Sequence, residues 1–242
     1  MNEEKQVIVA LDVASNDEML QMLKKIHRPG CYVKVGMELY LQNGADIVRI
    51  LKSEGYSVFL DLKLHDIPHT VYRAMKGLAR LGADMINVHA AGGAEMMRAA
   101  AEGLGEGAQS ERPICLAVTQ LTSTDQTMLE NELLIKRPID EVITQYASLA
   151  YSSGMDGVVC SAWEAQKIKN QTSAEFLAVT PGIRLTDDDA GDQKRVASPA
   201  QARHLGSDYI VVGRSITAAA DPEEAYQRVL DDWRNQTWKT TN

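Results

Sequence analysis

Residues 57–90 read SVFLDLKLHDIPHTVYRAMKGLARLGADMINVHA, and they predict a strand, a helix and a second strand in succession. The two ends, Ser57–Leu64 and Met85–Ala90, are short and mostly apolar, with the length typical of buried strands. Between them lies a stripe of apolar residues at helical spacing: Val71, Met75, Leu78 and Leu81. Gly82 then follows as a helix stop. Such a unit joins two parallel strands through a crossover helix.

The same unit recurs along the chain. Strand-like segments are expected at Gln6–Val13, Cys31–Met37, Ser57–Leu64, Met85–Ala90, Pro113–Leu121, Gly157–Ser161, Phe176–Gly182 and Tyr209–Ser215. With helical stretches between them, the 242 residues divide into eight βα units of about 30 residues each. We therefore predict an α/β protein, a (β/α)8 TIM barrel, with residues 1–242 forming a single domain. An open doubly wound sheet is disfavoured because no Gly-x-Gly-x-x-Gly motif follows the first strand.

The composition is that of an ordinary globular protein, with 45% hydrophobic and 24% charged residues and a net charge of −8. An acidic balance disfavours nucleic-acid binding, because backbone phosphates require clustered Lys and Arg. No run approaches the roughly 20 apolar residues that span a bilayer, and the polar segment Met1–Lys5 does not resemble a signal peptide. Cys31, Cys115 and Cys160 lie in apolar stretches, which predicts buried, reduced thiols. We expect a cytoplasmic protein without nucleic-acid or membrane partners.

The third predicted strand carries the clearest functional signal. Its leucines, Leu60, Leu62 and Leu64, share one face by strand alternation. Asp61, Lys63 and His65 then share the other face, where a barrel interior is ordinarily apolar. We therefore expect these polar side chains to have a chemical role.

Further polar residues fall near the carboxyl ends of other strands: Asp12 in the first, Lys34 in the second, and Asn87 and His89 in the fourth. Active sites of this fold lie at that end of the barrel. A purely structural ion-pair network is the alternative interpretation, but apolar residues often stabilise a core as well or better. His89 is more typical of a satisfied interior histidine.

Lysines among carboxylates stay protonated, because a nearby opposite charge favours the charged form. A cationic lysine suits proton donation and stabilisation of a developing anion, whereas a Schiff base needs the free amine. The pattern therefore indicates carbanion chemistry on an acidic substrate.

The ends of the seventh and eighth strands predict a phosphate site. Each ends in a glycine followed closely by an arginine: Gly182 with Arg184, and Gly213 with Arg214. The loops after these strands are the usual phosphate site of this barrel, and backbone N–H groups with an arginine fork match a phosphate dianion. The polar stretch 186–198 between these strands is either a solvated acidic loop or a lid over the site.

Seven motifs carry a resemblance to a known family: Ala10–Asp12, Val33–Gly36, Asp61–Pro68, Val88–Ala90, Gln120–Ser123, Thr180–Arg184 and Val212–Ser215. They are similar to those of the orotidine 5′-phosphate decarboxylase family, over nearly the whole chain. The block Asp61–Pro68 is the most specific of them. The resemblance implies decarboxylation of orotidine 5′-phosphate to UMP and CO2 in pyrimidine biosynthesis, with no cofactor and no metal.

The resemblance also implies roles for the matching residues. Lys63 donates a proton to the carbanion left at carbon 6 of the pyrimidine, and Asp61 lies against the carboxylate that departs. Lys34 pairs with the carboxylates and the ribose. Asp12 holds a ribose hydroxyl, and Thr122 contacts the pyrimidine edge.

At the phosphate end, the resemblance implies that Gln193 bridges phosphate and base. Arg214 and the Gly213 amide bind the phosphate, and Arg184 matches another position that the family uses for substrate. Closure of the loop 186–198 over the phosphate would then assist the chemistry.

The family also implies a homodimer, in which Asp66, Ile67 and Thr70 reach into the neighbouring subunit's pocket. His69 departs from the family pattern, which commonly has a small or hydroxyl residue after the proline.

Other functions remain open at this point. Related barrel enzymes that act on sugar phosphates share the Asp-x-Lys-x-x-Asp spacing but use magnesium; the Ile67-Pro68 continuation argues against them. A Schiff-base aldolase and a non-catalytic sensor of phosphorylated metabolites are further alternatives. A zinc site on His65, Asp66 and His69 is disfavoured because Pro68 interrupts the helical spacing that it requires.

Overall fold

The computed structural model describes residues 6–185 and 196–235, which form a closed barrel of eight parallel strands. Each strand pairs with its neighbour in sequence, and β8 pairs with β1 to close the ring. The strands are β1 (Val7–Ala10), β2 (Tyr32–Gly36), β3 (Ser57–Leu64), β4 (Met85–His89), β5 (Ile114–Val118), β6 (Gly157–Val159), β7 (Leu177–Thr180) and β8 (Tyr209–Val212). The predicted (β/α)8 barrel is confirmed, while the assignment of all residues 1–242 to one domain stays a prediction.

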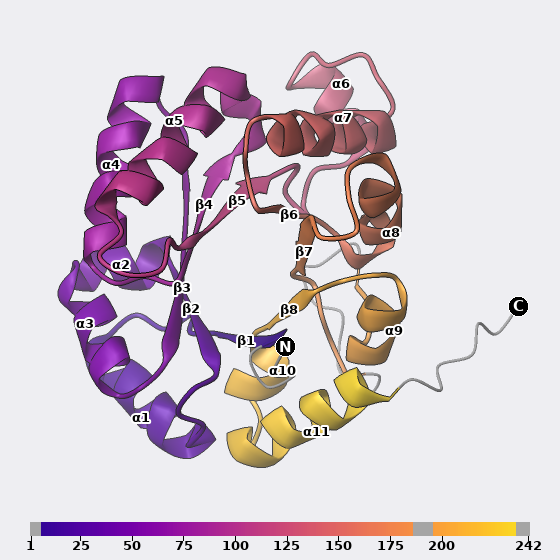
Figure 1. Ribbon diagram of the computed structural model, residues 1–242. Helices are drawn as coiled ribbons and strands as arrows, with labels where there is room; N and C mark the ends of the chain where they lie inside the picture. The colour runs from indigo at the N-terminus through magenta and orange to yellow at the C-terminus, as the bar shows by residue number, and fades with distance from the viewer. Residues whose placement is uncertain (1–5, 186–195, 236–242) are drawn as a thin grey trace, which may run out of the picture.

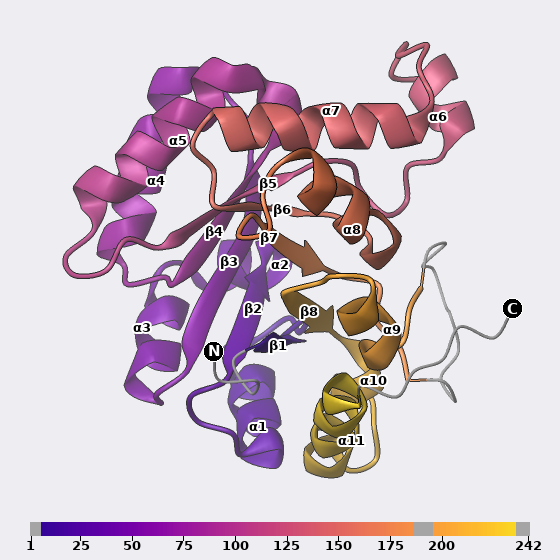
Figure 2. The same cartoon turned by 45° about the vertical axis from the view of Figure 1, so that its right-hand side comes forward.

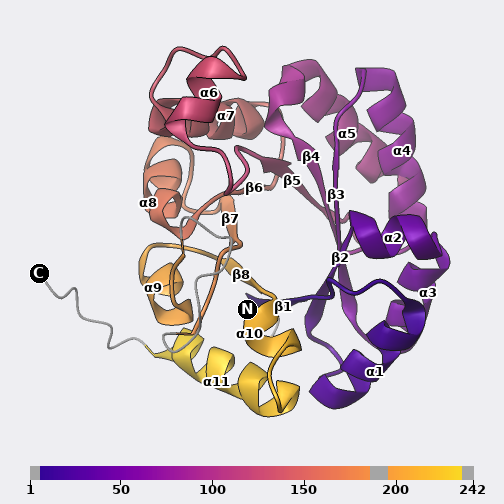
Figure 3. The ribbon, with the colours of Figure 1, turned by 180° about the vertical axis from the view of Figure 1, so that it is seen from behind.

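Helices surround the strands on all sides, as Figure 1 and the reverse view in Figure 3 show. They are α1 (Asn16–Ile26), α2 (Met37–Asn43), α3 (Asp46–Ser53), α4 (Pro68–Arg80), α5 (Gly93–Gly107), α6 (Gln126–Asn131), α7 (Ile139–Ser152), α8 (Ala162–Gln171), α9 (Pro199–His204), α10 (Arg214–Thr217) and α11 (Pro222–Arg234). Three connections carry two helices where the repeat predicts one. The added α6 lies beyond the end of α7, outside the ring (Figure 2). Within the described part of the chain, no helix is both long and apolar enough to cross a membrane.

Side chains of the strands pack into two separate cores. The larger one fills the space between strands and helices, and the leucines of β3 pack in or against it. The smaller one fills the barrel interior with Ile8, Ala10, Tyr32, Phe59, Met85, Leu116, Val179, Tyr209 and Val211. Phe59 therefore points inward and Leu60 outward, as the alternation of a strand requires.

The pairing of β3 with β4 contains an irregularity at the mouth of the barrel. Leu60 pairs with Ile86 and Leu64 with Val88, so the three β3 residues between the leucines face Asn87 alone. Lys63, inside this bulge, adopts a φ of 51°, in the left-handed region that costs a residue with a Cβ about 1–2 kcal/mol. The bulge is thus a costly local feature, and such features often lie beside active sites.

The opposite end of the barrel contains a repeated device. A Gly-x-Asp sequence precedes β4, β6 and β8, and its aspartates are Asp84, Asp156 and Asp208, which we call the base aspartates. Each carboxylate accepts a backbone N–H from the strand that precedes it in the chain. The donors are Val58 of β3 for Asp84, Cys115 of β5 for Asp156 and Ala178 of β7 for Asp208. Each also pairs with a cation: Lys52, Arg112 and Lys169 respectively.

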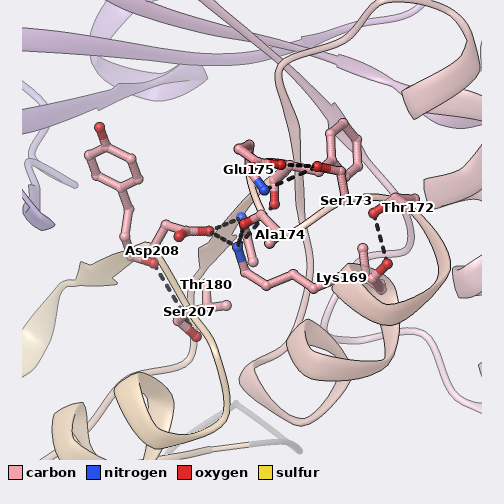
Figure 4. Close-up of polar contacts among 12 residues, drawn as sticks. Lys169, Thr172, Ser173, Ala174, Glu175, Thr180, Ser207 and Asp208 are labelled. Carbon is pink, nitrogen blue, oxygen red and sulfur yellow. Dashed lines mark hydrogen bonds and ion pairs between the residues drawn. The ribbon is translucent and has the colours of Figure 1, made fainter.

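Asp208 illustrates the arrangement (Figure 4). Its Oδ2 accepts the N–H of Ala178 at 2.7 Å and lies 2.8 Å from Lys169 Nζ. The same ammonium donates to the carbonyl oxygens of Ala174 and Phe176 at 2.9 and 3.2 Å. The base aspartates therefore tie the start of one strand to the start of the next.

Candidate active site

A cavity of about 460 Å³ opens at the carboxyl ends of the strands. Its floor includes Ala10, Phe59 and Val211 from the inner core. Eight of the residues predicted for the site line it: Asp12, Lys34, Asp61, Lys63, Thr122, Arg184, Gly213 and Arg214. The closed barrel brings these residues together from six of its eight strands or the loops directly after them. The volume suits a ligand of nucleotide size.

Four of the lining residues form a chain of alternating charge that we call the mouth network: Asp12, Lys34, Asp61 and Lys63. Lys34 Nζ lies 3.0 Å from Asp12 Oδ1 and 3.4 Å from Asp61 Oδ2. Lys63 Nζ lies 2.6 Å from Asp61 Oδ1. Asp61 thus holds one lysine on each of its oxygens, which fixes both ammonium groups at the wall of the cavity.

Burial and charge act in opposite directions on these groups. Lys34 is only 9% exposed, and burial alone would lower its pKa. The carboxylates of Asp61 and Asp12 outweigh that effect and raise the pKa of Lys34 above its ordinary value. Burial likewise disfavours the charged form of Asp61, but Lys34 and Lys63 lower the pKa of Asp61 below its usual range. Lys34 is therefore an ammonium and Asp61 a carboxylate at neutral pH.

Asn87 of β4 supports this network from behind. Its Nδ2 donates to Asp61 Oδ1 at 2.7 Å, and its Oδ1 accepts the backbone N–H of Lys63 at 2.8 Å. Asn87 is completely buried. The sequence shows Asn87 as a polar residue inside a strand. Its role depends on the bulge of β3, which the sequence does not reveal.

The end of the cavity at which the sequence predicts a phosphate site is formed by the turns after β7 and β8. Pro181, Gly182 and Arg184 line it on one side, and Gly213 with Arg214 on the other. The chain on either side of residues 186–195 is paired: Arg184 N donates to Ala197 O at 3.1 Å, and Ala197 N donates to Gly182 O at 3.2 Å. Gln193 and most of that loop lie outside the described residues.

The third side of the cavity comes from the ends of β5 and β6. Gln120, Leu121 and Thr122 line it after β5, and Val159 at the end of β6 lines it together with the following Cys160. Of these, only Thr122 is predicted to be a site residue from the sequence. Gln120 belongs to the same motif as Thr122, which is the signal that could have found it. Cys160, 2% exposed, matches the buried thiol that its apolar surroundings predict.

Asp66, Ile67 and Thr70 do not line the cavity of their own chain. All three are exposed, and Ile67 is 66% exposed although it is a large apolar residue. They lie where β3 gives way to α4, next to the mouth. The described cavity therefore contains none of the three.

His65 does not line the cavity, although Asp61 and Lys63 do. The His65 ring lies 5.8 Å from the ring of His89, and the expectation that His65 shares a face with Asp61 and Lys63 stays a prediction. Burial, followed by the nearby His65 and Lys63, lowers the pKa of His89, which is therefore neutral at pH 7. Among residues 6–185 and 196–235, no group of three His, Cys, Asp or Glu side chains is placed to hold a metal ion.

Comparison with known proteins places this geometry in a family. Residues 5–229 match the model of the orotidine 5′-phosphate decarboxylase / HUMPS family. Among curated relatives, orotidine 5′-phosphate decarboxylase of Geobacillus thermodenitrificans is 59% identical over 228 residues, covering 93% of this chain and 95% of that protein. The enzyme of the same name from Bacillus caldolyticus is 59% identical over 236 residues, covering 97% of both chains.

Solved structures agree with the sequence matches. The crystal structure of orotidine 5′-phosphate decarboxylase from Lactobacillus acidophilus superposes with a TM-score of 0.87 at 41% identity, covering 96% of this chain and all of that one. Identity of this extent, over a barrel of the same shape, leaves one assignment: the chain belongs to the orotidine 5′-phosphate decarboxylase / HUMPS family.

Proposed function

We propose that this protein decarboxylates orotidine 5′-phosphate to UMP and CO2, in pyrimidine biosynthesis, without a metal or a cofactor. The observation that carries the proposal is the mouth network, in which one mostly buried carboxylate holds two lysines. The same cavity is lined by two arginines from the turns after β7 and β8. The names of the relatives, at 59% identity over nearly the full length, support decarboxylation over the other chemistries of the family.

The cavity orients the substrate from its two ends. Arg214, Arg184 and the Gly213 amide bind the phosphate, and Gln193 joins them from the loop. Asp12 and Lys34 bind the ribose hydroxyls. The pyrimidine then lies against Thr122, with its carboxylate directed to Asp61. Binding of the remote phosphate supplies free energy that holds the reacting end in place.

Asp61 acts by repulsion. Two like charges about 4 Å apart, at an effective dielectric constant of about 20, repel by roughly 4 kcal/mol. Loss of CO2 removes the substrate's carboxylate charge from beside Asp61, so the repulsion is relieved on the way to the product. Relief of that energy in the transition state corresponds to about three powers of ten in rate.

Lys63 acts as electrostatic stabiliser and proton donor. The bond between carbon 6 and the carboxylate breaks, CO2 leaves, and the electron pair stays on carbon 6 as a vinyl carbanion. The Lys63 ammonium stabilises this charge and transfers its proton to carbon 6. The neutral amine then recovers a proton from water, which returns the enzyme to its starting state.

The homodimer and the cytoplasmic location are part of the same proposal. Asp66, Ile67 and Thr70 reach the partner's site, and the exposure of Ile67 supports this because a large apolar side chain is poorly placed in water. Three buried free thiols, Cys31, Cys115 and Cys160, suit a reducing compartment.

Purified protein, assayed in EDTA for the loss of orotidine 5′-phosphate absorbance, tests the function. Turnover that survives EDTA is expected and excludes the magnesium-dependent alternative. Binding of UMP without turnover would instead indicate a sensor and overturn the proposal. Borohydride treatment in the presence of substrate should leave Lys63 and Lys34 unmodified, since both are ammonium groups in this mechanism.

A further inference from the structure

Asn87 occupies an unusual place in the barrel. It is 0% exposed, lies in the middle of β4 and points to the interior side of β3, where its neighbours in the inner core are apolar. A buried amide is costly unless its donor and acceptor are both satisfied. Here both are satisfied by the mouth network, through Asp61 Oδ1 and the Lys63 N–H.

These two partners fix the orientation of the amide. The Lys63 N–H can only donate, and the ionised Asp61 carboxylate can only accept. The amide must therefore present its oxygen to Lys63 and its nitrogen to Asp61. A reversed amide would place donor against donor and acceptor against acceptor, so a single rotamer of Asn87 serves both contacts.

The contact with Lys63 replaces part of the strand ladder. In the bulge, three residues of β3 face Asn87 alone, and Lys63 has a φ of 51°. Its N–H donates to the Asn87 side chain at 2.8 Å. This bond offsets part of the energetic cost of the left-handed backbone at Lys63.

The contact with Asp61 fixes the rotation of the Asp61 carboxylate. Asp61 Oδ1 accepts from both Lys63 Nζ and Asn87 Nδ2, at 2.6 and 2.7 Å, while Oδ2 faces Lys34 at 3.4 Å. Because the two donors to Oδ1 come from different strands, rotation of the carboxylate would break one of these bonds. Asn87 thus holds the plane of the carboxylate.

We propose that Asn87 is a positioning residue for decarboxylation, which sets the relative placement of the Asp61 carboxylate and the Lys63 ammonium by bonding to both residues at once. The inference rests on the proposed function, because the placement matters only if these two groups act on the substrate. Asn87 itself does not line the cavity.

Asn87→Asp is the sharpest test, because it keeps the shape and changes one donor. The introduced carboxyl can still accept the Lys63 N–H, but its second oxygen faces Asp61, and two adjacent carboxylates cannot both ionise without penalty. When the pair holds one proton, an O–H replaces the lost N–H donor and the net charge returns to that of the wild type. The ratio of variant to wild-type kcat should therefore rise several-fold or more as pH falls from about 9 to about 5.

Asn87→Leu removes both contacts and should lower kcat about 10²-fold, with UMP affinity within about threefold of wild type, because the phosphate turns are untouched. Thr180→Val is the matched control. Thr180 is equally buried in β7 and bonds to Ser207 and Tyr209, away from the mouth network. Its variant should keep wild-type kcat, and thermal unfolding of all three variants reports any loss of folding.

A measurement independent of turnover separates this inference from the proposed function. In Asn87→Leu, the Asp61 carboxyl loses a donor, so its pKa, followed by ¹³C NMR, should rise relative to wild type. A flat pH ratio for Asn87→Asp, or an unchanged Asp61 pKa in a folded Asn87→Leu variant, overturns the positioning role. An inactive wild-type protein with the expected Asp61 shift would overturn the proposed function and leave the geometric role of Asn87 standing.

Discussion

The two ends of the barrel use the same residue types for opposite purposes. At the base, each of Asp84, Asp156 and Asp208 accepts a backbone N–H as well as a cation. At the mouth, the partners of Asp61 within residues 6–185 and 196–235 are side chains, namely two lysines and Asn87. A carboxylate bound to backbone amides joins strands, whereas one bound to side-chain ammoniums holds charge against a cavity. The contacts at the base therefore stabilise the fold, whereas the charges at the mouth add little stability and are placed for the reaction.

The largest difference between the two ends should appear on removal of the mouth ammonium. Lys63→Ala should lower kcat by about 10⁴-fold or more, since it deletes both the proton donor and the nearest cation. UMP binding, measured by calorimetry, should remain detectable because the phosphate turns are intact. Substantial residual turnover would contradict the role of Lys63 as proton donor.

Mixing of inactive protomers tests whether the mouth is completed by a second chain. If Asp66 serves the partner's site, a dimer of one Lys63→Ala and one Asp66→Asn subunit contains one intact site and one doubly altered site. Random pairing of equal amounts should then restore about one quarter of wild-type activity. The restored rate is read after dissociation and reassembly of the mixture. Absence of recovery, with heterodimers demonstrated by native mass spectrometry, would contradict a shared site.

The phosphate end of the mouth should show a smaller effect, confined to ligands that carry phosphate. Arg214→Ala removes charge-assisted hydrogen bonds and should weaken UMP binding by about 10- to 100-fold. Uridine binding should change little, and titration of both ligands provides the comparison. Equal losses for the two ligands would remove Arg214 from the phosphate site.

At the base, the effect should be on stability alone. Asp156→Ala leaves the Cys115 N–H without its acceptor and should lower the free energy of unfolding by about 1–3 kcal/mol, or about 2–4 °C in Tm per kcal/mol. Its kcat should match that of wild type. Asp46→Ala is the control, because Asp46 pairs with Arg49 at an exposed surface and should leave Tm unchanged. A large fall in kcat for Asp156→Ala would break the division between base and mouth.

The smallest effect concerns the acid side of the stability profile. The folded-state pKa of Asp61 is lowered, so the carboxylate contributes stability that is complete above its unfolded pKa of about 3.9 and is lost as pH falls through the folded value. Asp61→Asn cannot titrate. Urea unfolding should therefore show that wild type loses more stability than the variant between about pH 5 and about pH 2.5. An equal loss would mean that the lysines do not lower the pKa of Asp61.

Much of the barrel and part of its mouth follow from periodicity in the sequence. All eight predicted strands exist, because short apolar runs between helical stripes fix both element type and order. Alternation also predicts that Asp61 and Lys63 face inward, and both line the cavity. The bulge that adds residues to β3 leaves no mark in the pattern. For the same reason, the role of Asn87 depends on pairing between strands that no single strand reveals.

The base aspartates can be predicted from a repeated motif in the sequence. Gly-x-Asp ends at positions 84, 156 and 208, each time directly before an even-numbered strand. The glycines predict helix ends, and the aspartate two residues later is part of the same signal. The second helix after each of β2, β5 and β8 is not predicted, because the repeat length allows one helix per unit and short helices such as α6 bury few residues.

The carboxylate bonds of each base aspartate reach back no further than the residues just before the preceding strand. Those of Asp84 reach back to Lys52, those of Asp156 to Arg112, and those of Asp208 to Lys169. Among the described residues, none of these carboxylate bonds crosses the exposed turn at Gln109 and Ser110, between α5 and β5, whereas the backbone bond from Ile114 N to Asp84 O does. A polypeptide cut at that turn would yield two halves that each keep their carboxylate contacts and that rejoin through the pairing of β4 with β5, so this turn is the natural place to split the enzyme into fragments that reassemble, or to open new ends by circular permutation.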